Sequence, residues 1–81
     1  MRVSVHLWSY FRDLAGTSRL ELELPPGSTV AVLLDAVYAL YPRLAGLRNS
    51  SLIAVGVDYQ RPDHVLRAGD EVSLFPPVQG G

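Results

Sequence analysis

The sequence predicts an α+β domain in which a mixed sheet of four to five strands packs on one main helix. Two observations lead to this prediction. Apolar and polar residues alternate over several short stretches, as in strands with one buried face. One stretch, from about residue 28 to 41, instead places apolar residues three and four apart, as in an amphipathic helix. The order of these stretches is β-β-α-β-(β)-β, so every strand can bury its apolar face against the same helix.

The first two strands are expected to form an antiparallel hairpin, because they are close in sequence. Residues 2–10 alternate, and their inner face would hold three aliphatic side chains: Val3, Val5 and Leu7. Residues 18–24 alternate again, with three leucines on the inner face: Leu20, Leu22 and Leu24. Between the two strands, residues 11–16 are typical of a short helical turn that ends at a glycine.

The helix is bounded by recognisable signals. Pro25-Pro26-Gly27 ends the second strand, and Ser28 or Thr29 can cap a helix that continues to about Tyr41. Pro42 then marks its end, because the residue before a proline avoids helical dihedral angles. Six residues form the predicted apolar stripe: Val30, Leu33, Leu34, Val37, Leu40 and Tyr41. Residues 43–51 are expected to be a connection, in which Leu44 and Leu47 could form another helical turn.

The remaining chain returns to strands. Residues 52–57 form an apolar, β-branched strand, and residues 58–60 are expected to turn into a short edge strand. Residues 61–67 should be irregular because of Pro62, with Val65 and Leu66 tucked under them. After a tight turn at residues 68–70, residues 71–75 form the last strand, with Val72 and Leu74 facing inward.

The economical arrangement of these elements is the β-grasp, or ubiquitin-like, fold. The first and last strands would then lie side by side and parallel at the centre of the sheet. The chain is expected to divide into a β-grasp domain at residues 1–75 and a projecting tail at residues 76–81.

Composition excludes several classes of function. The chain has no cysteine, which excludes disulfides, thiolate metal sites, iron–sulfur ligation and cysteine nucleophiles. Its net charge of −1 gives no indication of a basic surface that would bind nucleic acid. All basic residues are arginine, so no side-chain amine is present to be acylated. No apolar run reaches the roughly 20 residues that span a bilayer, and no signal peptide is evident, so we expect a cytoplasmic protein.

The sequence also lacks a catalytic constellation of its own. His6 and His64 are far apart, without a third metal ligand or an acid–base partner in view. No phosphate-binding loop of the Walker type occurs, so any ATP would have to be handled by another protein. We therefore expect a chain that is not catalytic alone and that binds no metal or cofactor itself.

The sequence ends in Pro76-Pro77-Val78-Gln79-Gly80-Gly81, which is its most informative segment. Two terminal glycines leave a carboxylate without a nearby Cβ, so such an end can pass through a narrow channel and expose its carboxyl carbon. Pro76 and Pro77 favour an extended base, although they could simply end the strand. Six extended residues reach about 20 Å, enough to enter a buried site on a partner. The alternative is an ordinary frayed end.

A docking surface is expected beside this tail. Trp8 and Phe75 would lie on the outer face of neighbouring central strands, with Tyr59 approaching the same face and His6 flanking it. Exposed aromatic clusters are uncommon on monomers and often mark protein interfaces. The alternative is a set of scattered surface aromatics without a function.

The chain resembles the MoaD-type sulfur carriers, the small subunits of molybdopterin synthase, within the ubiquitin-like MoaD/ThiS family. The resemblance is strongest in the ending Asp70-Glu71-Val72-Ser73-Leu74-Phe75-Pro76-Pro77-Val78-Gln79-Gly80-Gly81. It extends to residues 11–16, 25–30 and 53–55. Gly56 departs from it, since these proteins often carry asparagine at this position in the third strand.

This resemblance implies a function and a set of partners. A MoeB-like enzyme would use ATP to adenylate the carboxylate of Gly81, which a sulfur donor system would convert into a thiocarboxylate. Within the MoaE-like large subunit, the thiocarboxylate would give its sulfur to a pterin precursor in molybdenum cofactor biosynthesis. Gly80 and Gly81 would form the reactive end. Seven residues would contact the partners: Trp8, Tyr59, Phe75, Pro76, Pro77, Val78 and Gln79.

Two alternatives remain open at this point. The chain could be a ThiS-like or other ubiquitin-like sulfur carrier that serves thiazole synthesis or tRNA thiolation. It could also be a non-catalytic β-grasp interaction module with an inert tail, whose partners would tolerate deletion of Gly81.

Overall fold

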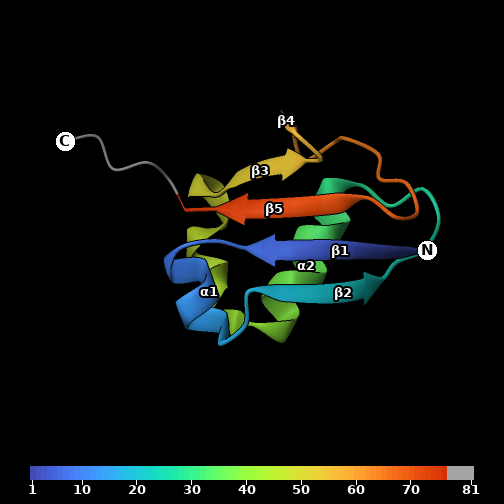
Figure 1. The fold of residues 1–81 in the computed structure, drawn as a ribbon. Coiled ribbons are helices and arrows are strands. Elements are labelled where there is room, and N and C mark those ends of the chain that lie inside the picture. The colour runs from blue at the N-terminus through green and yellow to red at the C-terminus, as the bar shows by residue number, and fades with distance from the viewer. Residues whose placement is uncertain (77–81) are drawn as a thin grey trace.

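A computed structural model describes residues 1–76, apart from the side chains of Tyr10 and of residues 47–50. Its elements follow the predicted β-β-α-β-(β)-β order, and short helices form in the two segments for which the sequence suggested a helical turn (Figure 1). In chain order they are β1 (Arg2–Leu7), α1 (Tyr10–Ala15), β2 (Arg19–Glu23), α2 (Val30–Leu40), the 3-10 helix η1 (Pro42–Ser50), β3 (Leu52–Val55), β4 (Asp58–Tyr59) and β5 (Glu71–Phe75).

The five strands form one mixed sheet in the order β2-β1-β5-β3-β4. β1 and β5 are parallel neighbours at its centre, and the other neighbouring pairs are antiparallel. Helix α2 lies across one face of this sheet (Figure 1). The predicted β-grasp arrangement is therefore confirmed, including the parallel central pair.

The core lies between α2 and the inner face of the sheet. Val5 on β1 pairs with Val72 on β5, and Leu7 pairs with Leu74, so the central strands present matched rows of aliphatic side chains. All four are buried, as the alternation predicts. Helix α2 contributes five buried residues to the same core: Val30, Leu33, Leu34, Val37 and Tyr38. Thr29 caps the helix, since its side chain accepts a hydrogen bond from the backbone N–H of Val32.

The predicted helix stripe is wrong at its C-terminal end. Leu40 is 58% exposed, whereas Tyr38, which the stripe omits, is buried. Leu40 is the last residue of α2, and the following cap residue Tyr41 is half-buried against the core, so the error in the stripe concerns Leu40 and Tyr38. Leu44 on η1 is fully buried and extends this part of the core, in the segment where a further helical turn around Leu44 and Leu47 was considered.

Two predicted strands are too long. The first ends at Leu7, not at residue 10, because the chain turns into α1 and buries Phe11. The third ends at Val55, because Gly56 has a φ of +63° and begins a two-residue turn into β4. Val57, at the tip of this turn, is 97% exposed. In both places a turn follows the strand where the alternating pattern alone predicts continuation.

The remaining predictions about the core hold in part. Leu22 and Leu24 are buried, whereas Leu20 is only half-buried against the core. Leu66 is buried under the irregular segment, but Val65 is exposed. Within residues 1–76, none of the helices is both long and apolar enough to cross a membrane.

Candidate functional site

The site begins where the two central strands end. Because β1 and β5 are parallel, their C-terminal ends meet at the same edge of the sheet, the edge at which residue 76 follows β5 (Figure 1). Trp8 directly follows β1, and its backbone N–H donates a hydrogen bond of 3.2 Å to the carbonyl oxygen of Leu74. This bond extends the ladder by one residue and places Trp8 beside Phe75, the last residue of β5.

Trp8, Phe75 and Tyr59 form an aromatic cluster on the sheet face opposite α2. The rings of Trp8 and Phe75 are stacked, with centroids 5.7 Å apart and planes inclined by 13°. Tyr59 on β4 meets Phe75 edge-on, with centroids 6.5 Å apart. Aromatic pairs at these separations attract each other by about 0.5–1.5 kcal/mol beyond their buried area. The three residues predicted to share this face are thus in contact.

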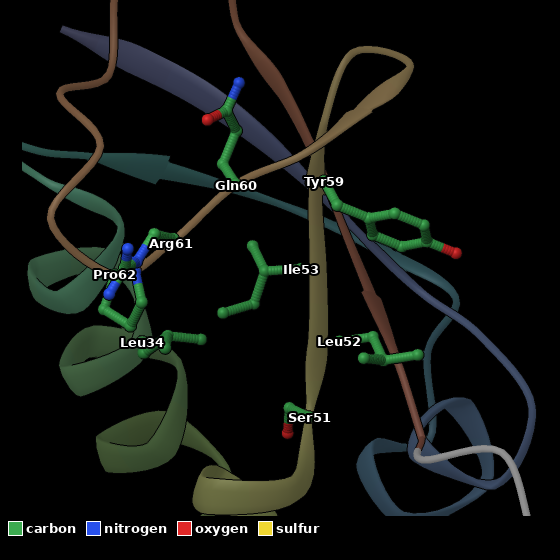
Figure 2. Close-up of a pocket in the computed structure, with 8 residues that line it drawn as sticks. All are labelled: Leu34, Ser51, Leu52, Ile53, Tyr59, Gln60, Arg61 and Pro62. Atoms are coloured by element: carbon green, nitrogen blue, oxygen red, sulfur yellow. The ribbon is translucent and has the colours of Figure 1, made fainter.

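Strand β3 lies between β5 and β4, and its side chains determine how Tyr59 reaches Phe75. Leu52 pairs with Phe75, and Ala54 pairs with Tyr59. Figure 2 shows Leu52 and Tyr59 on one side of β3 and Ile53 on the other. The small side chain of Ala54 leaves room for the tyrosine ring to lean across the strand. Leu52 therefore adds an aliphatic residue to the cluster, a role that the sequence did not single out.

The side chains of the aromatic cluster are largely exposed to solvent and are not part of the core. Trp8 is 48% exposed and Tyr59 is 71% exposed, and Leu52 beside them is also exposed. Monomeric proteins rarely leave a contiguous group of large apolar side chains in water. The position at the end of β5 and this exposure together make the cluster a candidate docking surface.

The other half of the same sheet face is charged. At the start of β1, the Nε of Arg2 donates to the Oε1 of Glu23 at 3.0 Å, and Arg2 also lies near Glu21. His6 lies at the border between the two halves, with its Nε2 3.4 Å from the Oε1 of Glu71. The outer face is thus apolar near residue 76 and polar at the far end.

A hollow of about 390 Å³ lies beside the cluster, between β3 and α2 (Figure 2). Four apolar residues line it: Leu34, Leu52, Ile53 and Pro62. Its polar lining comes from Ser51, Tyr59, Gln60 and Arg61. No carboxylate or imidazole stands among these residues, so the hollow offers no pair for acid–base catalysis.

The histidines and Pro76, which the sequence analysis considered as site residues, are also described by the structure. His64 lies in the segment after β4, whereas His6 lies on β1. Over the described part of the chain, no three histidine or acidic side chains gather as a metal site would need. Pro76 is half-buried at the end of β5. Pro77, Val78, Gln79, Gly80 and Gly81 lie outside the described residues.

Comparison with known proteins gives a consistent picture. The sequence model of the ThiS family matches residues 5–81. The molybdopterin synthase sulfur carrier subunit of Arabidopsis thaliana is 30% identical over 81 residues, which are 100% of this chain and 84% of that protein. Small archaeal modifier protein 1 of Haloferax volcanii is 32% identical over 92 residues, covering 91% of this chain and 98% of the relative.

A solved structure agrees with these sequence relatives. The putative molybdopterin converting factor, subunit 1, from Pyrococcus furiosus superposes with a TM-score of 0.88 and is 31% identical. The alignment covers 96% of this chain and 99% of that one. The fold, the match of the family model up to Gly81 and these relatives lead to one conclusion: this chain belongs to the ThiS family of ubiquitin-like proteins.

Proposed function

We propose that this chain is the sulfur carrier subunit of a molybdopterin synthase. The observation that carries the proposal is the exposed aromatic cluster at the end of β5, directly before the segment that ends in Gly80-Gly81. A docking surface at this position would set the direction in which the terminal residues enter a partner. The relatedness to a molybdopterin synthase sulfur carrier subunit over the whole chain supports the same function.

The proposed chemistry takes place at the carboxylate of Gly81. A carboxylate is a poor electrophile until one of its oxygens becomes part of a leaving group. An adenylating enzyme of the MoeB type would let this carboxylate attack the α-phosphorus of ATP, releasing pyrophosphate and forming an acyl adenylate. A sulfur donor at the oxidation level of sulfide would then attack the acyl carbon and displace AMP, which leaves a thiocarboxylate. ATP is thus used in the partner's active site, which agrees with the absence of a Walker loop in this sequence.

This chain itself would bind the partner proteins and present its C-terminal carboxylate to them. The aromatic cluster would rest on the adenylating enzyme and, in a later complex, on the large subunit that holds the pterin precursor. The same face would serve both partners in turn, because the segment that ends in Gly81 follows β5 at this edge of the sheet. The polar half of the face, with Arg2, Glu21 and Glu23, would stay at the rim of the interface, where charged pairs contribute to orientation more than to affinity.

The test is a reconstituted sulfur transfer with three forms of the chain. Wild-type chain should pass sulfur to the pterin precursor, whereas a form extended by one alanine after Gly81 should not, because its carboxylate is displaced from the reacting position. The extended form should still bind the large subunit, since its docking face is unchanged. A Leu40→Ala form, altered on the helix layer, is the control and should transfer sulfur normally. Equal transfer by the extended and native forms would refute the proposal.

A second candidate function rests on the relatedness to small archaeal modifier protein 1. As a modifier, the activated carboxyl group would form an amide with an amine of another protein instead of accepting sulfur. This sequence has no lysine, and the α-amino group of Met1 donates a hydrogen bond of 2.7 Å to the carbonyl oxygen of Leu24. Amide-linked products would therefore have to be sought on other proteins. Their detection after incubation with ATP and an adenylating enzyme would favour this candidate.

A further inference from the structure

A second hollow, of about 230 Å³, borders the aromatic cluster at Trp8. Its other lining residues are His6, Leu7, Arg12 and Ser18. Ser18 directly precedes β2, and β2 pairs with β1 on the side opposite β5. The hollow therefore extends the docking face from Trp8 towards β2, in the direction away from the stacked ring on β5.

The short helix α1, which lies at the C-terminal end of β1 (Figure 1), holds Arg12 at this hollow. The carbonyl oxygen of Trp8 accepts a hydrogen bond of 3.2 Å from the N–H of Phe11, whose side chain is fully buried. The N–H of Arg12 donates to the carbonyl oxygen of Ser9 at 3.1 Å, and the carbonyl oxygen of Arg12 accepts from the N–H of Gly16 at 2.9 Å. The backbone of Arg12 is thus fixed beside Trp8, while its side chain is exposed.

The guanidinium group of Arg12 is only weakly paired. Within residues 1–76 its one ion pair is with the neighbouring Asp13, whose Oδ1 lies 3.8 Å from the Nε. Both side chains are exposed, and an exposed pair at this separation contributes little. Arg2, by contrast, is held by Glu23 at 3.0 Å in the polar half of the face. Of the described residues that line the hollow none is acidic, so an anion that entered it would meet the guanidinium group without a competing carboxylate there.

We propose that this hollow receives a carboxylate of the partner protein, from an aspartate or glutamate that binds Arg12 while an apolar surface beside it covers Trp8 and Phe75. The inference rests on the proposed function, because it names the chemistry of the surface that the docking face would meet. A guanidinium group binds a carboxylate through two parallel hydrogen bonds, and such bonds are stronger than those between neutral groups. Arg12 thereby determines which partner surfaces are accepted, and the aromatic cluster supplies the apolar contact.

Titration with the molybdopterin synthase large subunit from the same genome measures the effect of this charge. Arg12→Gln removes the charge and should weaken the affinity about 5- to 30-fold. Arg12→Glu should weaken it further, because two carboxylates would then face each other. Added salt should weaken the binding of the wild type more than that of Arg12→Gln, since only the wild type has an ion pair to be screened. Circular dichroism checks that both variants are folded.

Arg67→Gln is the matched control. Arg67 is also an exposed arginine, but it lies before β5, at the opposite end of the sheet from Trp8. In that region the N–H of Gly69 donates to the carbonyl oxygen of Arg2, at the start of β1. The affinity of Arg67→Gln should stay within about two-fold of the wild type, and its salt dependence should be unchanged.

A zero-length cross-link identifies the partner's carboxylate directly. The sequence has no lysine, so Arg12→Lys and Arg67→Lys each introduce one side-chain amine at a known position. A carbodiimide activates carboxylates in the complex, and an amine in contact attacks the activated carbonyl carbon, forms an amide and releases a urea. Peptide mapping by mass spectrometry should find the amine of Arg12→Lys joined to an aspartate or glutamate of the large subunit, and that of Arg67→Lys joined to none.

Two results would overturn this inference alone. One is an affinity of Arg12→Gln within about two-fold of the wild type. The other is a saturated complex of Arg12→Lys in which the introduced amine forms no cross-link to the large subunit. In both cases the wild type still binds its partner, so the proposed function stands. If the wild type binds neither the large subunit nor the adenylating enzyme, the proposed function and this inference fail together.

Discussion

Trp8 and Phe75, from opposite ends of the sequence, stack with their ring centroids 5.7 Å apart and their planes inclined by 13°. The parallel pairing of β1 and β5 brings them together, and Leu7↔Leu74 is the last pair of the ladder before them. The pair therefore joins the central sheet to the point where the chain leaves the domain. The proposed function depends on this relationship more than on any pocket.

Removing either ring should weaken binding to the partners without unfolding the domain. Trp8→Ala and Phe75→Arg are each expected to lower affinity for the large subunit about 10- to 100-fold, the range seen when an aromatic residue at the centre of an interface is lost. Isothermal titration calorimetry would measure this, with circular dichroism as a check on folding.

Leu40→Ala is the matched control for these two variants. Leu40 is also a large exposed apolar residue, but it lies on α2, on the opposite layer of the fold. Its removal should leave the affinity within about two-fold of the wild type. A docking role for the aromatic cluster would be ruled out if all three variants, correctly folded, bound as tightly as the native chain.

The hairpin between β3 and β4 should depend on the backbone of Gly56. Its positive φ at the first central position of a two-residue turn is typical of a type II′ turn, where glycine is preferred. Gly56→Ala should therefore cost about 1 kcal/mol of unfolding free energy, although the space around the added Cβ is open. Urea denaturation would measure the loss.

Gly46→Ala and Gly56→Asn test the cause of that loss. Gly46 also has open space where alanine would place its methyl group, but it has no positive φ, so its substitution should cost little. Asparagine tolerates a left-handed backbone better than alanine, so Gly56→Asn should be the milder change at this position. Equal losses at Gly46 and Gly56 on substitution by alanine would contradict a conformational origin.

Leu44 should contribute more to the stability of the domain than Leu40, which is the reverse of what helical periodicity predicts. Leu44→Ala removes a fully buried side chain from η1 and should destabilise the domain by about 2–5 kcal/mol. Leu40→Ala should change stability by no more than about 0.5 kcal/mol, since most of that side chain is in water. Thermal unfolding of the two variants would show the difference, and a larger loss at Leu40 would contradict the described core.

These leucines show how far the sequence predicts the fold. Alternation predicts the buried faces of β1 and β5, because the period of a strand is fixed by its backbone. It does not predict where a strand ends, since Trp8 and Val57 continue the pattern while the backbone already turns. Nor can a helical stripe show that α2 stops at Leu40 and that η1 supplies the next core residue.

The candidate site was predictable to a similar degree. The shared face of Trp8, Tyr59 and Phe75 follows from strand order and alternation, and the structure brings the three rings together. Leu52 could have been found from the same alternation once its pairing with Phe75 was known. The positive φ of Ser9, between Trp8 and α1, has no signal in the sequence, because serine at a helix start is ordinary and only the dihedral angles reveal the conformation.

The central claim is that this chain is a sulfur carrier. Its most direct test is the intact mass of the chain after incubation with ATP, an adenylating enzyme of the MoeB type and a sulfur donor. A sulfur carrier should gain the mass difference between sulfur and oxygen at a single position, and a form that lacks Gly81 should not. An unchanged mass, obtained with an enzyme that is active on another carrier in the same preparation, would contradict the account.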